Sequence, residues 1–350
     1  MTETLARDAV DAVDVVLAEF FEDRIRRATP LTEHYALLWQ RLARSSEGGK
    51  RLRPRLLLNT HRAFGGEHPE DATTAAAAFE LLHTALLLHD DVIDRDLSRR
   101  GRPNVSAEFA GDATDRNLSQ AAAVAWGDAS GILGGDLLLS AAHTLAARVR
   151  PEVRAELAAI IDESLFRAAA GEQDDVAFGL GTTSATPERV VRMMENKTAG
   201  YSFAAPLRAG AALAGAGEHA PAELDRVGIA LGVLYQLRDD LIGVFGDTRR
   251  TGKSTTSDLR QGKRTLLVAF AEGQPAWTAV RHLWGDPQLD QAGADRLRDA
   301  LVTSGARDAT TDLIDIMRRD AVATIGESAL PTDLRRELAT LADALAERES

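Results

Sequence analysis

Two pairs of adjacent aspartates each close a strongly apolar stretch of this 350-residue sequence. The first pair belongs to His-Asp-Asp-Val-Ile-Asp at 89–94, and the second to Gln-Leu-Arg-Asp-Asp-Leu-Ile-Gly at 236–243. Asp90 and Asp94 are four residues apart, so on a helix they share one face, about one turn apart. Like charges at this spacing destabilise a bare helix, and acids near its C-terminus oppose the helix dipole. A bound Mg²⁺ would remove both penalties, because it prefers carboxylate oxygens. A solvated acidic helix end is the alternative.

Basic residues gather in three further segments. The first is Gly-Gly-Lys-Arg-Leu-Arg-Pro-Arg at 48–55, and the second is Arg-Arg-Gly-Arg-Pro at 99–103, directly after the first acid cluster. The third is the glycine-punctuated loop 246–265, which favours a lid over a phosphate. Glycines before a dense cation cluster let the backbone approach an anion closely, and cations near metal-binding acids suit a polyphosphate. None has the Walker A spacing, and basic surface turns are the alternative.

Only four of the 41 basic residues are lysines, and all four fall in or beside motifs of this kind. Lys50 lies in the first basic segment, Lys197 in Asn-Lys-Thr at 196–198, and Lys253 and Lys263 in the loop 246–265. Elsewhere arginine stands in place of lysine, so these positions favour a compact ammonium over a guanidinium. Their placement is the main internal indication of diphosphate binding.

Bulk properties exclude several classes of protein. The formal net charge of −12 argues against a nucleic-acid binder. The sequence has no cysteine, which excludes disulfides and thiolate metal sites and indicates a reducing compartment. No apolar run approaches the ~20 residues of a membrane span. The acidic N-terminal stretch lacks the basic start of a signal peptide. We therefore expect a cytoplasmic protein without a membrane span.

Apolar residues recur at helical spacing along most of the chain, and no segment alternates long enough to require a strand. High alanine and leucine content with only 5% aromatic residues also favours helix. The polar stretch 97–116 is predicted to be a loop. Helices are predicted over 4–28, 31–44, 54–64, 72–94, 117–148, 151–173, 187–213, 222–245, 264–271, 292–304, 307–326 and 332–347. No linker or repeat stands out, so we expect one all-helical domain over residues 1–350.

The order of these motifs resembles that of the trans-isoprenyl diphosphate synthases, the polyprenyl synthetase family. The resemblance extends from residue 48 to residue 265, with helices before and after, and is most like geranylgeranyl diphosphate synthases. It implies the all-α isoprenoid synthase fold, a single large helical bundle around a central cavity. It also implies a homodimer with three Mg²⁺ ions per active site. The activity implied is condensation of isopentenyl diphosphate with an allylic diphosphate, by ionisation, condensation and elimination.

Matching the motifs residue by residue implies the following roles. Asp90 and Asp94 would bind two metal ions and Asp239 a third, with Asp91 and Asp240 as outer or alternative ligands. The allylic diphosphate would be held by Arg99, Lys197, Thr198, Gln236, Lys253 and Lys263. Isopentenyl diphosphate would be held by Lys50, Arg53, His83 and Arg100. Asp90, Asp94, Lys197 and Asp239 are the residues expected to carry catalysis.

The sequence departs from the family pattern at two places. Gly243 stands where many members have a third aspartate, so metal binding there would depend on Asp239 and Asp240, with Asp247 a weaker candidate. Glu172 stands where many relatives have glutamine. Neither change removes a residue that the scheme requires.

Product length depends on the residues beneath the first acid cluster, where Ala85, Leu86 and Leu82 would form the floor. Ala85 stands at the fifth position before Asp90, where short-product members often have a bulky aromatic residue. We therefore expect a C20 product, geranylgeranyl diphosphate, with farnesyl or longer products as alternatives. Two other functions are alternatives. A class I terpene cyclase would not need the segment 48–55, so the presence of this segment counts against it. A non-catalytic subunit of a heteromeric prenyltransferase would tend to lose one acid cluster, whereas both are present here.

Overall fold

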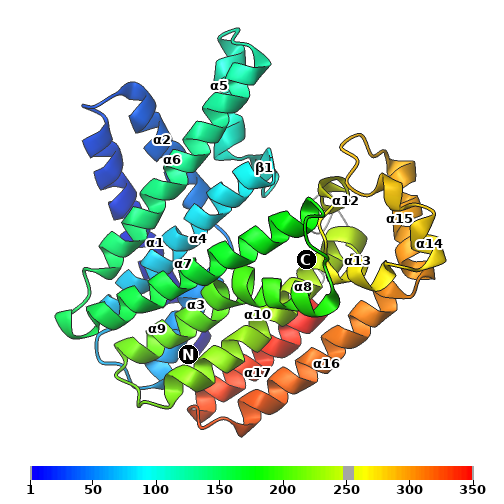
Figure 1. Cartoon of the computed structure of the whole chain (residues 1–350). Helices are drawn as coiled ribbons and strands as arrows, with labels where there is room; N and C mark the ends of the chain where they lie inside the picture. The colour runs from blue at the N-terminus through cyan, green and yellow to red at the C-terminus, as the bar shows by residue number, and fades with distance from the viewer. Residues whose placement is uncertain (1, 247–255, 349–350) are drawn as a thin grey trace. The chain divides into compact units, whose positions relative to one another are not determined.

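A computed structural model describes residues 2–246 and 256–348 of the chain (Figure 1). The described residues are almost entirely helical, and their only strands are two of two residues each. Their contacts divide the chain into two compact units. Unit 1 is Met1–Ile160 with Ala209–Ala216, and unit 2 is Ile161–Arg208 with Gly217–Ser350. The prediction of an all-α fold is confirmed, whereas a single domain around a central cavity stays a prediction. None of the described helices combines the length and apolar character needed to cross a membrane.

Unit 1 is built around the contact between two long helices, α4 and α6, which run side by side (Figure 1). Alanines fill much of the buried face of α4, and Gly131, Gly134 and Gly135 bring α6 close to it. A Cβ on Gly131 would lie 2.6 Å from Val92 Cγ2, and one on Gly135 would lie 2.2 Å from His89 Nε2. The elements of unit 1 are α1 (Thr2–Ala28), α2 (Glu33–Ser46), α3 (Leu52–Ala63), α4 (Pro69–Ile93), β1 (Ser98–Arg99), β2 (Arg102–Pro103), α5 (Val105–Asp115), α6 (Gln120–Ala146) and the start of α7 (Pro151–Gly179).

Unit 2 is centred on α10, which packs against the π-helix η1 and against α16 and α17. Gly228 and Gly232 allow the close approach, because a Cβ on either would lie 2.4 Å from the Cα of Ala204 or Ala199. Besides the rest of α7 and the first turn of α9 (Ala205–Leu213), whose remainder belongs to unit 1, its elements are α8 (Pro187–Met194), η1 (Glu195–Ala204), α10 (Ala220–Phe245), α12 (Ser257–Gln261), α13 (Leu266–Ala271), α14 (Pro275–Thr278), η2 (Arg281–Leu283), α15 (Gln291–Thr303), α16 (Ala306–Glu327) and α17 (Thr332–Glu347).

The prediction of a loop over 97–116 is wrong. A short hairpin occupies its start, and α5 then follows. Asn104 begins α5 by accepting a hydrogen bond from the backbone N–H of Ala107. Phe109 and Ala113 are buried one turn apart, so α5 has the apolar face that its polar composition concealed.

The helix predicted over 187–213 is present with these bounds, as α8, η1 and α9 in unbroken succession. Its middle is the π-helix η1, and the backbone N–H of Ala205 donates to the oxygen of Gly200, five residues back. The wider turn of the π-helix lies against Gly171 of α7. A Cβ on Gly171 would be 2.2 Å from the backbone nitrogen of Lys197. Short helices α12, α14 and η2 were not predicted.

Candidate active site

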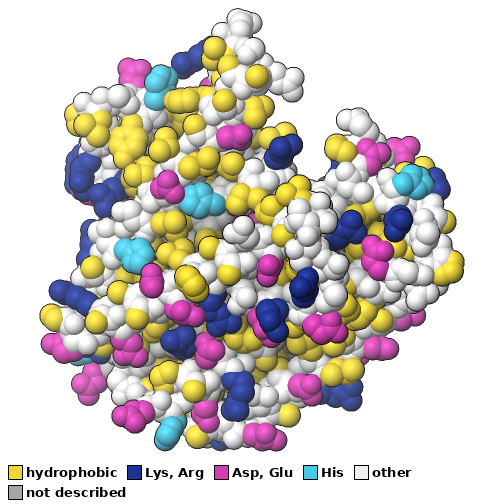
Figure 2. Space-filling model, in the orientation of Figure 1, with side chains coloured by type: hydrophobic (Ala, Val, Ile, Leu, Met, Phe, Trp, Pro, Cys, Tyr) yellow, Lys and Arg dark blue, Asp and Glu magenta, His cyan; other side chains and the backbone are white. Residues whose placement is uncertain are grey.

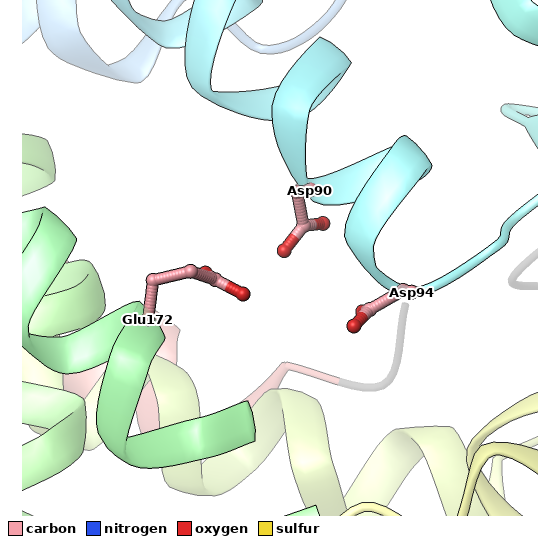
Figure 3. A group of neighbouring side chains, drawn as sticks. All are labelled: Asp90, Asp94 and Glu172. Carbon is pink, nitrogen blue, oxygen red and sulfur yellow. The ribbon is translucent and has the colours of Figure 1, made fainter. Parts of the chain in front are cut away.

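Asp90 and Asp94 lie on the last turns of α4 with their carboxylates on the same side of the helix (Figure 3). A carboxylate oxygen of one lies within 4.8 Å of a carboxylate oxygen of the other. Both side chains are half-buried, and α4 ends with Asp94 as its C-cap. The predicted one-turn pair is therefore present. The third side chain drawn in Figure 3, Glu172, belongs to unit 2 and is described below.

Arg99 neutralises the same cluster from the short hairpin that follows α4. Its Nε donates to Asp91 Oδ1 at 2.8 Å, and its Nη2 lies 3.2 Å from Asp90 Oδ2. The hairpin turns at Arg100 and Gly101, which both have positive φ, as a two-residue type I′ turn requires. Asp91 is buried, and this burial raises the pKa of its carboxyl to about 6 against the opposing effect of Arg99. The acids in turn raise the pKa of the Arg99 guanidinium, which stays charged.

The glycine-rich segment before α3 brings a second group of cations together. Gly48 and Gly49 have positive φ, and so does Arg51, a conformation that costs an arginine backbone strain. Arg51 is held there by ion pairs to Glu80 at 2.8 Å and Asp14 at 2.6 Å. These ion pairs hold the backbone of the segment that is predicted to bind substrate. The sequence did not indicate this structural role for Arg51.

Arg100 links this loop to the hairpin. Its Nη1 donates to the oxygen of Glu47 at 2.8 Å, and a Cβ on Gly49 would lie 2.9 Å from its Nη2. The missing side chain at Gly49 therefore makes room for the guanidinium. Lys50, the next residue along the chain, has an exposed side chain.

His83 lies on α4 among these cations. Burial, followed by the charges of Arg53, Arg99, Arg100 and Arg51, holds the pKa of its imidazole well below the usual 6.5. Arg53 and Arg100, predicted with His83 to hold isopentenyl diphosphate, are thus close enough for their charges to act on this imidazole. At neutral pH this imidazole is uncharged, so it would bind a phosphate by donating an N–H.

In unit 2, Lys197 is the centre of a carboxylate pair contributed by α7. Its Nζ lies 2.9 Å from Glu172 Oε2 and 2.7 Å from Asp175 Oδ2. The π-helix η1 carries Lys197, and Gly171 lets its backbone approach α7. Asp175 is a partner that the sequence reasoning missed, although it lies three residues after Glu172 on the same helix face.

Thr198, Gln236 and Asp240 form a hydrogen-bonded chain from η1 to α10. Thr198 Oγ1 donates to Gln236 Oε1 at 3.1 Å, and Gln236 Nε2 donates to Asp240 Oδ1 at 2.7 Å. Burial raises the pKa of the Asp240 carboxyl to about 8, Gln236 opposes the rise, and the charges of Asp239 and Asp258 add to it. Asp240 therefore keeps its proton at pH 7, while Asp239 pairs with Arg348 at 3.1 Å.

The space left by Gly243 is filled by another acid. A Cβ at position 243 would lie only 1.9 Å from Asp258 Oδ2, so the carboxylate of Asp258 lies directly against the glycine. A third aspartate at this position would displace Asp258. Lys263 follows α12, and its charge opposes the rise in the pKa of Asp240. Lys253 and Asp247 lie outside the described residues.

The predicted floor residues lie on α4 below Asp90. Leu82 and Ala85 are fully buried, and Leu86 is half-buried. Half-buried Tyr235 lies against Phe203 with 5.6 Å between ring centroids. Tyr201 is buried.

The donor set fits Mg²⁺. Asp90 and Asp94 would hold this ion in unit 1, and Asp239 would offer a ligand in unit 2. All three supply the hard oxygen ligands that Mg²⁺ prefers. The Asp90–Asp94 oxygen separation of up to 4.8 Å allows both to bind one ion or each to bind its own.

Comparisons with known proteins agree with this geometry. The sequence profile of the family described as polyprenyl synthetase matches residues 38–288. A geranylfarnesyl diphosphate synthase of Aeropyrum pernix is 35% identical over 267 residues, covering 75% of this chain and 78% of its own length. A nonaprenyl diphosphate synthase of Mycobacterium tuberculosis is 32% identical over 302 residues, covering 85% and 82%. A solved structure of a Corynebacterium glutamicum geranylgeranyl pyrophosphate synthase, complexed with isoprenyl diphosphate and magnesium, matches with a TM-score of 0.89 at 27% identity, covering 97% of this chain and 98% of its own.

The match in fold over nearly the full length of both chains gives this protein the all-α isoprenoid synthase fold. The chain belongs to the polyprenyl synthetase family and is a trans-prenyltransferase that makes polyprenyl diphosphates. The predicted family, fold class and enzyme class are confirmed. The three relatives are named for products of three different lengths, so membership of the family does not decide the product of this chain.

Proposed function

We propose that this chain condenses isopentenyl diphosphate head-to-tail with an allylic diphosphate, in trans, and that its main product is geranylgeranyl diphosphate. The observation that carries the product assignment is Ala85, which is fully buried on α4, five residues before Asp90. A methyl group there obstructs a growing chain less than an aromatic ring would. The geranylgeranyl synthase structure of similar fold supports the same choice.

In this proposal the two acid clusters and their cations act on the allylic diphosphate. Asp90, Asp94 and Asp239 would hold Mg²⁺, three ions per active site, and the bound metal would supply Lewis-acid stabilisation of the diphosphate. Arg99, Lys197, Lys253 and Lys263 neutralise the charge that develops on the departing group. Thr198 and Gln236 position it by hydrogen bonds, and Asp91 and Asp240 support the metal ligands.

The cations around His83 would hold isopentenyl diphosphate. Lys50, Arg53 and Arg100 supply charge, and the neutral imidazole supplies a directional N–H. The carbon–oxygen bond between the allylic group and diphosphate breaks first, the double bond of isopentenyl diphosphate then attacks the allylic cation, and the departed diphosphate takes the proton lost on elimination. Because diphosphate takes this proton, the reaction needs no side chain that acts as a dedicated base.

Incubation of the purified protein with Mg²⁺, isopentenyl diphosphate and each of the C5, C10 and C15 allylic diphosphates tests the activity. Chromatography of the dephosphorylated products should show a C20 alcohol. No turnover with any primer would contradict the proposal and favour a non-catalytic subunit. A main product of C15, or one longer than C20, would overturn the length assignment alone.

Substitutions at Ala85 test the floor. Ala85→Leu and Ala85→Phe should shorten the main product progressively, because each added side-chain volume takes space from the growing chain. The thermal midpoint of each variant, measured alongside, identifies any loss that comes from overpacking. Product lengths that stay unchanged in folded Ala85→Phe protein would show that Ala85 is not part of the floor.

We also propose that the protein is a homodimer that buries part of α6. This helix carries several exposed apolar residues, namely Val124, Trp126, Ile132 and Leu133. Hydrophobic side chains gather over this part of the surface in Figure 2. Exposed apolar groups concentrated on one helix favour a protein interface.

A further inference from the structure

The end of α17 meets α10 at the second acid cluster, and the residue that makes this contact is Arg348. Its Nη2 lies 3.1 Å from Asp239 Oδ1, and the two side chains are only 17% and 24% exposed. Partial burial makes such an ion pair stronger than one on an open surface. Arg348 was not among the residues expected to bind substrate or metal.

Two further contacts fix Arg348 in this position. Its guanidinium carbon lies 4.9 Å from the ring centroid of Tyr235, within the range of a cation–π contact. Its backbone oxygen accepts a hydrogen bond from Arg238 Nε at 2.5 Å. Tyr235 and Asp239 are four residues apart on α10, so one guanidinium covers a single helical turn. The arrangement is a built contact with three anchors on α10.

If a divalent cation bound to Asp239, it and the Arg348 guanidinium would be two positive charges beside the same carboxylate. Mg²⁺ binds a carboxylate oxygen at about 2.1 Å, and Arg348 Nη2 is 3.1 Å from Oδ1 of the same group. Their repulsion is strong at this range in a partly buried site. The ion pair also satisfies the charge that would otherwise attract the metal.

We propose that Arg348 is a latch on the second acid cluster: it holds Asp239 as an ion pair and leaves this carboxylate when Mg²⁺ binds. The inference rests on the proposed role of Asp239 as a metal ligand. Arg348 is a positioning residue in this scheme. Metal binding at Asp239 releases the end of α17 from α10, so the metal affinity of the second cluster is set partly by a helix about 100 residues further along the chain.

Metal titration of variants tests the latch. All variants are made in a parent protein that carries Asp90→Asn and Asp94→Asn. These changes remove the metal ligands of the first acid cluster, so the Mn²⁺ that still binds is bound at the second cluster. Mn²⁺ is the probe, and free Mn²⁺ is measured by electron paramagnetic resonance. Arg348→Gln in this background should bind Mn²⁺ about tenfold more tightly, the lower end for losing a competing hydrogen bond to a charged group.

Arg336→Gln is the matched control, because it removes the same charge from an exposed site on α17, 72% exposed and paired with Asp333. It should leave the Mn²⁺ affinity unchanged. Equal affinity in Arg348→Gln and its parent overturns the latch. Weaker affinity also overturns it, and assigns Arg348 to holding Asp239 ready for the metal.

Hydrogen exchange gives a second readout that does not depend on activity. Amides in the last turn of α17 should exchange faster on addition of Mn²⁺ to the parent, whereas Arg348→Gln should exchange rapidly with or without Mn²⁺. Protection that Mn²⁺ leaves unchanged overturns the proposal. If the parent protein with Asp90→Asn and Asp94→Asn binds no Mn²⁺ at all, Asp239 is not a metal ligand, and the latch is overturned with it. The prenyltransferase activity is tested separately, by the product assay with allylic diphosphates.

Discussion

The ammonium of Lys197 lies between the carboxylates of Glu172 and Asp175. All three side chains are only 16–21% exposed. Removing the cation would leave two carboxylates close together in a partly buried site. Removing one partner of a buried ion pair lowers the stability of the fold by more than an exposed ion pair contributes to it. Lys197 therefore contributes to folding as well as to the proposed binding of diphosphate.

We expect Lys197→Met to lower the free energy of unfolding by about 2–3 kcal/mol at pH 8. Adding Glu172→Gln and Asp175→Asn should restore most of the loss, since the repelling charges are then gone. Urea denaturation followed by circular dichroism measures both effects. Arg336→Met breaks an exposed pair and should cost no more than about 0.5 kcal/mol. A Lys197→Met variant as stable as this control would contradict the argument.

His83 makes stability depend on pH in a defined direction. Burial and four neighbouring arginines hold the pKa of its imidazole well below 6.5 in the folded protein. The unfolded chain takes up the proton near pH 6.5. The stability that this group contributes is therefore fully present above pH 6.5 and is lost as the pH falls below it, by at most about 1.4 kcal/mol per pH unit.

His83→Gln should flatten the fall in the free energy of unfolding between pH 6.5 and pH 5.5. Urea denaturation at a series of pH values measures the slope. His282→Gln serves as the control, because it removes an exposed histidine from the same chain. A wild-type slope that persists in His83→Gln would show that other groups cause it.

At the scale of elements, the contact between α4 and α6 determines where the first acid cluster lies. A Cβ on Gly131 would lie 2.4 Å from Ser106 Oγ and 2.6 Å from Val92 Cγ2. Val92 stands between Asp91 and Asp94 on the last turn of α4. A side chain at Gly131 must therefore push α4 or α5 away from α6.

Gly131→Ala should lower the free energy of unfolding by about 1–3 kcal/mol, the usual cost of overpacking. Gly111→Ala is the matched control, because α5 leaves open space around this position. It should be neutral or stabilising by up to about 1 kcal/mol, since alanine favours helix. Thermal and urea denaturation distinguish the two. A stable Gly131→Ala protein would mean that the helices adjust at little cost.

Sequence periodicity predicted the helices that carry the motifs, and it failed where tertiary contacts decide. The apolar stretches that became α4, α6 and α10 were recognised because their apolar residues recur at helical spacing. Helix α5 was missed because its start depends on the cap at Asn104 and its buried face on only three apolar residues, Val105, Phe109 and Ala113. The π-helix could not be predicted, because it depends on the approach of Gly171 to Lys197.

The candidate site divides in the same way. Spacing predicted that Asp90 and Asp94 share a face. Arg99 was predicted to hold the allylic diphosphate, and its ion pairs to Asp90 and Asp91 were not predicted. Contacts between residues far apart in the sequence carried no such signal. The pairing of Arg348 with Asp239 and the filling of the Gly243 position by Asp258 are of this kind.

At the scale of the whole molecule, α6 presents apolar residues to solvent. Trp126 and Leu133 are 40% and 55% exposed and seven residues apart, so they share a face. We expect the wild-type protein to elute with about twice its chain mass of 37.6 kDa in light scattering after gel filtration. Leu133→Glu should weaken the dimer, because a buried unpaired charge is costly.

Ile316→Glu is the control for this change, since it places the same charge on an exposed residue of α16. It should leave the mass unchanged. A wild-type protein of single chain mass at micromolar concentration would contradict the proposed homodimer. Equal masses for wild type and Leu133→Glu would instead place the interface elsewhere.

The buried carboxyl of Asp240 has a consequence for metal loading. Its pKa of about 8 means that it holds a proton at pH 7, and a cation arriving beside it at Asp239 favours the loss of that proton. On the proposed function, filling the second cluster is then an exchange of a proton for a metal ion. The heat of metal binding would depend on the ionisation enthalpy of the buffer, and the metal requirement would become more demanding as the medium turns acidic.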